Sequence, residues 1–96
     1  MIEFRRKFWR RYVSPNGFEI RLLPGPSLEY AEGSRRLVVA LERLTHPNGA
    51  GLYERSLVQW ASPDQLPITP AEREQIVHRI QELYVWLGKD LVVTDA

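Results

Sequence analysis

The sequence predicts a single α+β domain, in which an antiparallel meander of about four to six strands carries one C-terminal amphipathic helix packed on one face. Two observations lead to this fold class. Turn tripeptides separate segments in which apolar and polar residues alternate, and a capping sequence opens a helical segment at residues 69–88. The chain has 96 residues, of which 44% are hydrophobic. Because this length suits one hydrophobic core, we expect residues 1–96 to form one domain.

Two copies of the tripeptide Pro-Asn-Gly, at 15–17 and 47–49, predict hairpin turns. Proline presets the φ angle of a turn, and asparagine and glycine tolerate the positive φ that reverses the chain. After the first turn, residues 18–22 alternate between apolar and charged side chains, which is typical of a half-buried strand. Each tripeptide is therefore expected to join neighbouring antiparallel strands.

Three further strands are expected at Ser27–Ala31, Arg35–Leu44 and Leu52–Trp60. The Arg35–Leu44 segment is apolar on both faces, which favours a central position with both faces covered. The Leu52–Trp60 segment follows the second tripeptide and is expected to run back antiparallel to it.

The sequence Thr69-Pro70-Ala71-Glu72 is a capping box with proline at the first helical position. Apolar residues then recur with helical spacing at Ile76, Val77, Ile80, Leu83, Tyr84 and Leu87, and Gly88 is the expected stop. These features predict a helix that covers the sheet. Leu91–Thr94 is left open as a short edge strand or a tail.

The first thirteen residues are a basic aromatic segment, which we interpret as a strand over Phe8–Val13 leading into the first turn. Residues 1–11 carry a net charge of +4 and residues 12–96 one of −3, so the basic character is confined to one end. Cations that alternate with aromatic rings are typical of single-strand nucleic-acid binding. The alternative is a basic edge strand whose charges prevent edge-to-edge pairing. The candidate contact residues are Arg5, Arg6, Lys7, Trp9, Arg10 and Arg11.

Several function classes find no support in the sequence. It has no cysteine, no phosphate-binding glycine loop and no nucleophile elbow around a serine. His46 and His78 have no partners at ligand spacing, so neither a metal nor another cofactor is expected. Glu29, Glu32, Glu42 and Glu54 are more simply ion-paired or solvated than catalytic, and we expect no enzyme. With no apolar span and no secretory signal, a cytoplasmic protein without membrane contact is expected.

Val85 and Trp86 lie near the end of the predicted helix, outside the centre of its apolar face. An apolar pair turned partly outward indicates a partner surface, because tryptophan is enriched in binding hot spots. We give equal weight to the alternative that Trp86 packs under the loop between Pro63 and Pro67.

The order of these features resembles the immunity protein 74-like family, small immunity proteins encoded beside toxin genes in bacterial polymorphic toxin systems. The resemblance spans residues 27–88 and is carried by "LEYAEGSRRLVVALE", "GLYERSLVQW" and "ITPAEREQIVHRIQELYVWLG". The matching positions are Tyr30, Glu32, Gly33, Glu42, Tyr53, Ser56, Trp60, Pro63 and the helix from Thr69.

The resemblance implies a non-enzymatic protein that neutralises a cognate bacterial toxin by direct binding. We take Glu42, Tyr53, Arg55 and Trp86 as the first candidates for partner contacts, because charged and aromatic side chains dominate interfaces of this kind. The alternative function is a small nucleic-acid-binding or regulatory domain that uses the N-terminal basic aromatic residues.

Overall fold

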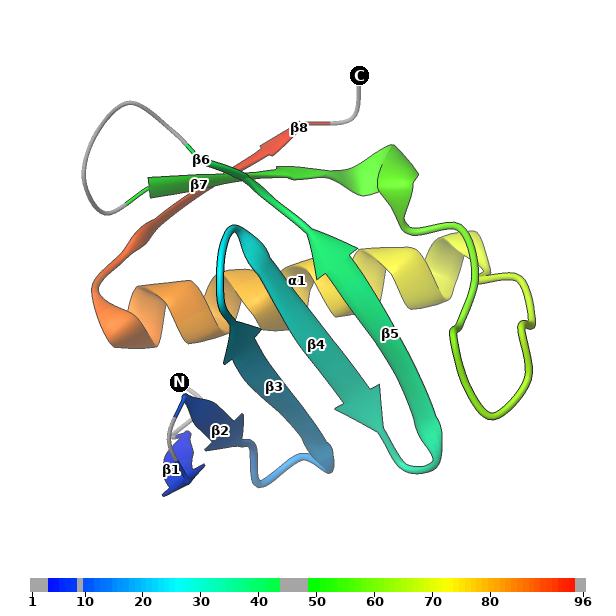
Figure 1. The fold of residues 1–96 in the computed structure, drawn as a ribbon, viewed down its shortest axis with the longest axis horizontal. Coiled ribbons are helices and arrows are strands. Elements are labelled where there is room, and N and C mark those ends of the chain that lie inside the picture. Colours follow the sequence, from blue (N-terminus) through cyan, green and yellow to red (C-terminus); the bar gives the residue numbers. More distant parts are fainter. Residues whose placement is uncertain (1–3, 9, 44–48, 95–96) are drawn as a thin grey trace.

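The computed structural model describes residues 4–8, 10–43 and 49–94. They form a five-stranded sheet with one helix packed behind it, and a three-stranded sheet along one edge (Figure 1). The strands are β1 (Arg5–Phe8), β2 (Arg11–Val13), β3 (Phe18–Leu23), β4 (Ser27–Glu32), β5 (Arg35–Ala40), β6 (Glu42–Arg43), β7 (Gly49–Tyr53) and β8 (Asp90–Thr94); the helices are the 3-10 helix η1 (Glu54–Ser56) and α1 (Pro70–Leu87). The expected α+β fold is confirmed.

The first sheet is an antiparallel meander in which β1 to β5 neighbour one another in chain order. The first Pro-Asn-Gly tripeptide joins β2 to β3, as expected. Gly17 has a φ of 90°, and the Ser14 amide donates to the Phe18 carbonyl oxygen at 2.9 Å, which closes the turn. Pro47 and Asn48 of the second tripeptide lie outside the described residues, although β6 and β7 on either side of it pair antiparallel.

The N-terminal segment forms a hairpin rather than the single strand expected over Phe8–Val13. β1 pairs antiparallel with β2, and the register shifts between Arg6 and Phe8. Arg10 lies in the turn with a φ of 60°, a left-handed conformation that few non-glycine residues adopt. The basic residues of this segment are therefore divided between two strands and a turn.

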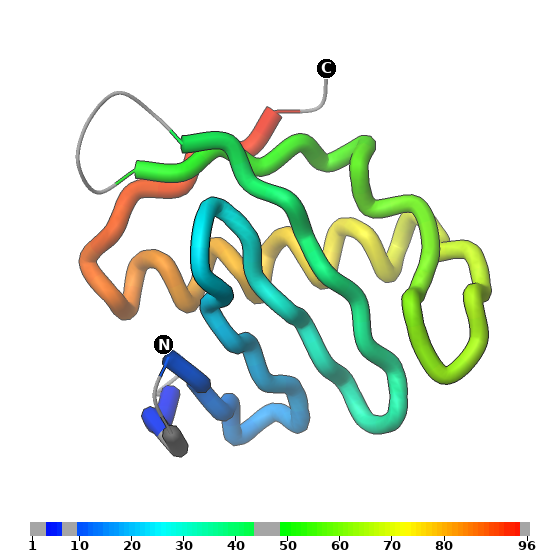
Figure 2. The backbone as a smooth tube through the Cα atoms, in the orientation of Figure 1, coloured from blue at the N-terminus to red at the C-terminus, as the bar shows by residue number. Residues whose placement is uncertain are grey.

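The segment expected as one central strand, Arg35–Leu44, is divided at Leu41 into β5 and β6, and Leu44 lies outside the described residues. The tube in Figure 2 shows the chain passing from the first sheet into the second at this point. β5 is the last strand of its sheet, bridged at Arg36 to Ser62 of the following loop, and Val38 is 58% exposed. The expected central position was wrong, because β5 ends its sheet and Val38 on its second face is exposed.

The second sheet has the order β6-β7-β8, with β8 parallel to β7. The strand expected over Leu52–Trp60 was wrong in extent, because the chain leaves β7 after Tyr53 and turns through η1. Leu57 and Trp60 are buried by this turn and the loop that follows it rather than by strand alternation. The last segment, left open between strand and tail, is the edge strand β8.

The helix α1 begins and ends where the sequence predicts. The Thr69 hydroxyl accepts from the Glu72 amide at 3.1 Å, and the Glu72 carboxylate accepts from the Thr69 amide at 3.0 Å. Gly88 ends the helix with a φ of 71°. Its buried residues, Ile76, Val77, Ile80, Leu83 and Tyr84, match the predicted apolar face. In the described part of the chain, no helix has the length and apolar character needed to span a membrane.

Four aromatic rings form a row between the first sheet and α1. The ring centroids of Phe4 and Phe18 are 5.7 Å apart, those of Phe18 and Tyr30 are 5.9 Å apart, and those of Tyr30 and Trp60 are 6.2 Å apart. Each separation lies within the range of favourable ring contacts. The row links the N-terminal strands to the loop after η1 through side chains alone.

Arg79 of α1 covers one side of this aromatic row. Its guanidinium carbon lies 4.6 Å from the Phe18 ring centroid, and its Nη1 donates to the Tyr30 hydroxyl at 2.8 Å and to Glu32 at 2.9 Å. The Tyr30 hydroxyl donates to the same Glu32 carboxylate at 2.8 Å. Burial is the main cause that raises the pKa of Tyr30, so this hydroxyl stays a proton donor.

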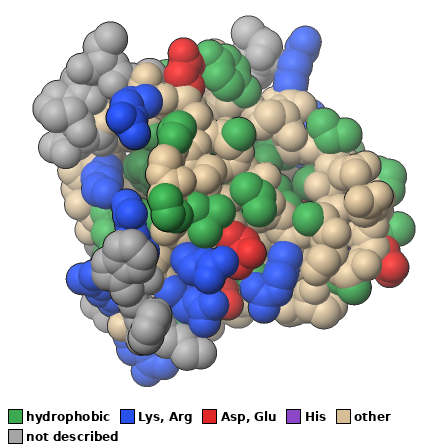
Figure 3. All heavy atoms as spheres, in the orientation of Figure 1, with side chains coloured by type: hydrophobic (Ala, Val, Ile, Leu, Met, Phe, Trp, Pro, Cys, Tyr) green, Lys and Arg blue, Asp and Glu red, His purple; other side chains and the backbone are tan. Residues whose placement is uncertain are grey.

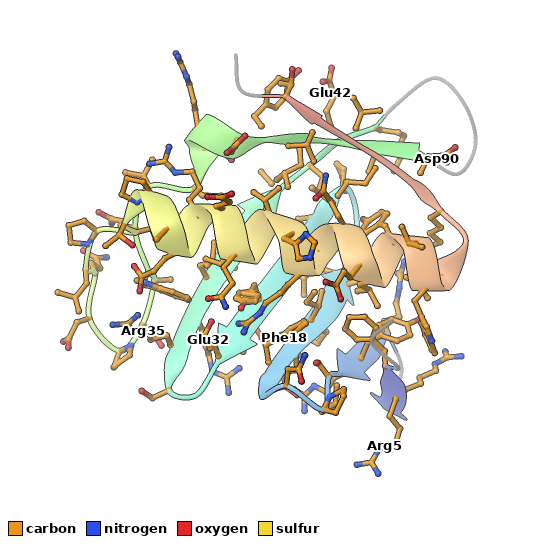
Figure 4. The ribbon with its side chains drawn as sticks, turned by 180° about the vertical axis from the view of Figure 1, so that it is seen from behind. Arg5, Phe18, Glu32, Arg35, Glu42 and Asp90 are labelled. Atoms are coloured by element: carbon orange, nitrogen blue, oxygen red, sulfur yellow. The ribbon has the colours of Figure 1, made fainter. Side chains whose placement is uncertain are left out.

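Arg35 forms a similar arrangement at the Trp60 end of the row. Its guanidinium carbon lies 5.2 Å from the Trp60 ring centroid, and its Nη1 lies 2.5 Å from a Glu72 carboxylate oxygen. Arg35, Glu32 and Phe18 lie along the part of the sheet that extends beyond the helix (Figure 4). The inner face of the first sheet is therefore covered by α1 and, beside the helix, by cations stacked on aromatic rings.

We expect Ile80→Ala to lower the free energy of unfolding by about 2 to 5 kcal/mol, because it leaves a cavity between α1 and the sheet. Ile80 is 0% exposed. Urea unfolding measures the change, and Gln81→Ala, one residue away on the exposed side of α1, is the matched control. An Ile80→Ala midpoint equal to that of the control would show that α1 does not cover the core.

The pKa of Glu72 is lowered from 4.5, chiefly by the Thr69 amide and then by Arg35. A lowered carboxyl pKa stabilises the fold above the unfolded value, and the effect is lost as the pH falls through the folded value. We therefore expect Glu72→Gln to be less stable than the native protein at pH 7 and the difference to shrink below about pH 4.5. Urea midpoints over this pH range test it, with Glu74→Gln as the exposed control; a pH-independent difference contradicts it.

Candidate protein-binding surface

A groove of about 440 Å³ lies between η1 and the outer side of α1. Figure 4 shows η1 above the N-terminal half of the helix. The groove is lined by Glu54 of η1 and by Ala71, Glu74, Gln75, Val77, His78 and Gln81 of α1. It exists because the chain turns out of β7 into η1 instead of continuing as a strand.

The groove is acidic. Glu54 and Glu74 line it from opposite elements, and none of the described residues that line it is a lysine or an arginine. His78 also lines it and is held by Glu82, whose carboxylate lies 2.7 Å from His78 Nε2. Val77, only 7% exposed, adds an apolar side chain. Carboxylates around an apolar groove floor suit a lysine or arginine side chain, which has an apolar stem and a charged tip.

Tyr53 and Glu42 lie on the outer face of the second sheet, and Tyr53 directly precedes Glu54 of the groove in the chain. Glu42 of β6 is the register partner of Gly51, two residues before Tyr53 on β7, so the two side chains meet diagonally across the strands. The Tyr53 hydroxyl donates to the Glu42 carboxylate, and this hydrogen bond is the main cause that raises the pKa of Tyr53. The hydrogen bond holds the Tyr53 ring in place. Because Tyr53 is 40% exposed, the ring is also open to a partner.

The structure brings together three of the four residues expected to contact a partner. Glu42 and Tyr53 are in direct contact, and Arg55 follows on η1, where it is exposed next to Glu54 of the groove. The Ser56 hydroxyl donates to the Tyr53 carbonyl oxygen at 2.7 Å and closes this short turn. The fourth, Trp86, belongs to another part of the molecule.

Trp86 packs against the N-terminal strands. Its ring centroid lies 5.9 Å from that of Phe4 and 5.9 Å from that of Tyr12. The alternative that Trp86 tucks under the loop of residues 63–67 is wrong, because that loop leads into the opposite end of α1 (Figure 1). Trp86 remains 39% exposed and Val85 70% exposed.

The N-terminal basic residues lie at one side of the open face of the first sheet. Arg11 pairs in register with Arg21 and lies 4.0 Å from Glu19. Arg5 and Arg6 are exposed on β1, and Arg10 is half-buried in the turn. Trp9 and the side chain of Lys7 lie outside the described structure.

Two further arginines lie on the open face of the first sheet, each beside a carboxylate. Arg21 and Arg36, from β3 and β5, share the face that α1 does not cover, and Glu29 lies between them at 3.7 Å and 3.4 Å. Figure 3 shows basic and acidic side chains next to each other over β3 and β4. Alternating strands bring these arginines to one face although they are distant in sequence.

The described residues hold no group of three or more histidine, cysteine or acidic side chains placed to bind a metal ion. His46 lies outside the described residues. Of the four glutamates weighed as catalytic candidates, Glu29 and Glu32 pair with arginines and Glu42 with Tyr53. Glu54 lines the groove.

Sequence reasoning missed Glu74, Gln75 and His78 as candidate contact residues. Their helical positions mark them as exposed, which is the signal available in the sequence, but exposure alone does not distinguish them from the rest of the outer face of α1. The position of η1 beside them makes the groove, and that position was hidden by the expectation of a longer strand.

Comparisons with models of protein families, with curated proteins and with solved structures found no match to this chain.

Proposed function

We propose that the protein is a non-enzymatic binding module that neutralises a bacterial toxin by holding it at the surface formed by the η1–α1 groove, Glu42, Tyr53 and Arg55. The observation that carries the proposal is the acidic groove, whose Glu54 directly follows a positioned, exposed tyrosine. Such a surface combines an aromatic anchor with charge, which is the composition of binding hot spots.

The groove specifies the chemistry of the partner. Glu54 and Glu74 attract a basic segment during encounter, and the Val77 side chain contacts the apolar stem of the lysine or arginine that enters. A basic protein such as a nuclease presents side chains of this kind. The resemblance of residues 27–88 to immunity proteins supports the same reading.

Co-expression with a toxin whose gene is found next to this one in the source genome tests the proposal. We expect the native protein to protect cells, and the double variant Glu54→Lys and Glu74→Lys to weaken toxin binding by about tenfold or more, because it replaces attraction with repulsion. Arg36→Gln, on the open face of the first sheet, is the matched control and retains protection. If the toxin kills cells equally well with and without the native protein, the proposal is wrong.

A second candidate function is binding of single-stranded nucleic acid on the open face of the first sheet. It is favoured by three arginines on that face, which are Arg11 of the N-terminal hairpin, Arg21 and Arg36. Against it, Phe4 and Tyr12 are buried in contact with Trp86, so these two rings are not free to stack on bases. Glu19 and Glu29 also offset part of the positive charge.

If this second function holds, the affinity for a labelled oligothymidine falls steeply between about 50 and 200 mM salt, because bound arginines release counterions from the phosphates. Arg11→Gln and Arg21→Gln each reduce the salt dependence, whereas Arg55→Gln on η1 leaves it unchanged. Failure of the native protein to retain the oligonucleotide at low salt excludes this function.

A further inference from the structure

The free edges of the two sheets differ in how they are protected. An edge strand offers unpaired backbone groups to other strands, and proteins guard such edges with charges, with short strands or with covering loops. At one edge of the first sheet, β1 carries the exposed Arg5 and Arg6. At the other edge, the Arg36 amide of β5 donates to the Ser62 carbonyl oxygen at 3.0 Å, so the following loop covers part of β5. In the second sheet, β6 has two residues, and both are charged.

The edge strand β8 differs from these three. Figure 4 shows β8 leading back above α1 from the C-terminal end of the helix. From Leu91 to Thr94 it carries neither a charge nor a proline, and none of the described strands pairs with its outer edge. Val92, at its centre, is 53% exposed. An edge of this kind is a template for another strand.

Val92 has no side chain directly opposite it on β7. Its register partner there is Gly51. Contacts between opposed side chains stabilise a sheet, and a glycine supplies none. Leu91 and Val93 point to the other face and pack against the core. A strand added at the outer edge of β8 would place a side chain directly opposite Val92.

The sequence of β8 complements itself in an antiparallel pair. When two copies of β8 pair about a two-fold axis at Val92, that residue lies opposite Val92 of the second copy, and Leu91 lies opposite Val93. Asp90 lies opposite Thr94, so each carboxylate faces a hydroxyl. A parallel in-register pair would instead place the two Asp90 carboxylates side by side, where like charges repel. Charge complementarity therefore favours the antiparallel pair with a second copy.

We propose that the protein forms a two-fold dimer in which β8 pairs antiparallel with β8 of a second copy, joining the two three-stranded sheets edge to edge. The outer edge of β8 gains hydrogen-bond partners, and the two Val92 side chains pack against each other. A pair of five-residue strands buries less than the roughly 1,200 Å² of a stable interface, so the dimer is weak, with a dissociation constant of about 10 to 100 μM.

Cross-linking through a single cysteine tests the register of the pair. The chain has no cysteine of its own. Directly opposed residues of an antiparallel pair have Cα atoms about 4.5 to 5.5 Å apart, a separation that a disulfide spans. At a chain concentration near the dissociation constant, we expect Val92→Cys to become mostly disulfide-linked dimer under mild oxidation, whereas Val38→Cys stays mostly monomeric. Val38 is the matched control, because it is a 58% exposed valine on β5, an edge strand of the first sheet.

Sedimentation velocity of the full chain, from about 5 to 500 μM, measures the association itself. We expect the mass to rise from that of one chain toward that of two. Val92→Lys weakens the dimer by about tenfold or more, because it places two like charges opposite each other. Val38→Lys leaves the dimer unchanged. Both valines are exposed, so we expect both variants to fold, which urea unfolding checks.

Three results would overturn the proposal. A chain that stays monomeric at about 500 μM leaves the edge of β8 to a strand of another protein. A mass that grows beyond that of two chains contradicts a two-fold pair, which is closed. Cross-linking of Val92→Cys no better than that of Val38→Cys, or native dimerisation of Val92→Lys, shows that any dimer uses another surface.

Discussion

The row of aromatic rings from Phe4 to Trp60 is the contact on which the rest of the fold depends. A single helix does not cover the whole inner face of a five-stranded sheet, and the uncovered margin would place apolar rings in water. Arg79 and Arg35 cover the two rings at that margin, Phe18 and Trp60, and each also pairs with a carboxylate. Cations stacked on rings keep their charged edges in solvent while their flat faces exclude water from the rings.

This arrangement joins the parts of the protein that carry its candidate surfaces. Trp86 and Phe4 connect the N-terminal hairpin to the end of α1, and Trp60 connects the sheet to the loop after η1. The Arg35–Glu72 pair then fixes the start of the same helix whose outer side forms the acidic groove. The packing of the row therefore helps to position α1, whose outer side forms the groove.

The features predicted correctly from the sequence are those set by near neighbours in the chain. The capping box at Thr69 and the alternation over residues 18–22 depend on contacts a few residues apart, and both were confirmed. The Leu52–Trp60 segment was misjudged because Leu57 and Trp60 are buried by a turn, and a turn leaves no periodicity to read. Glu42 meets Tyr53 because β6 and β7 pair antiparallel, whereas the groove depends on the position of η1 beside α1. Leu91–Thr94 was left open between strand and tail, because its partner β7 lies on the far side of α1 in the chain.

The parallel pairing of β8 with β7 has a consequence for the order in which the protein assembles. Gly49 is paired with Asp90, about forty positions later, with the whole of α1 in between. The first sheet is complete once residue 40 has been synthesised, but the second sheet lacks its last strand until the chain has passed through the helix. During synthesis, β7 is therefore an open edge, with its glycines offering unpaired backbone groups to any neighbouring strand. Rapid formation of α1, helped by its strong N-terminal cap, shortens the time for which that edge is exposed.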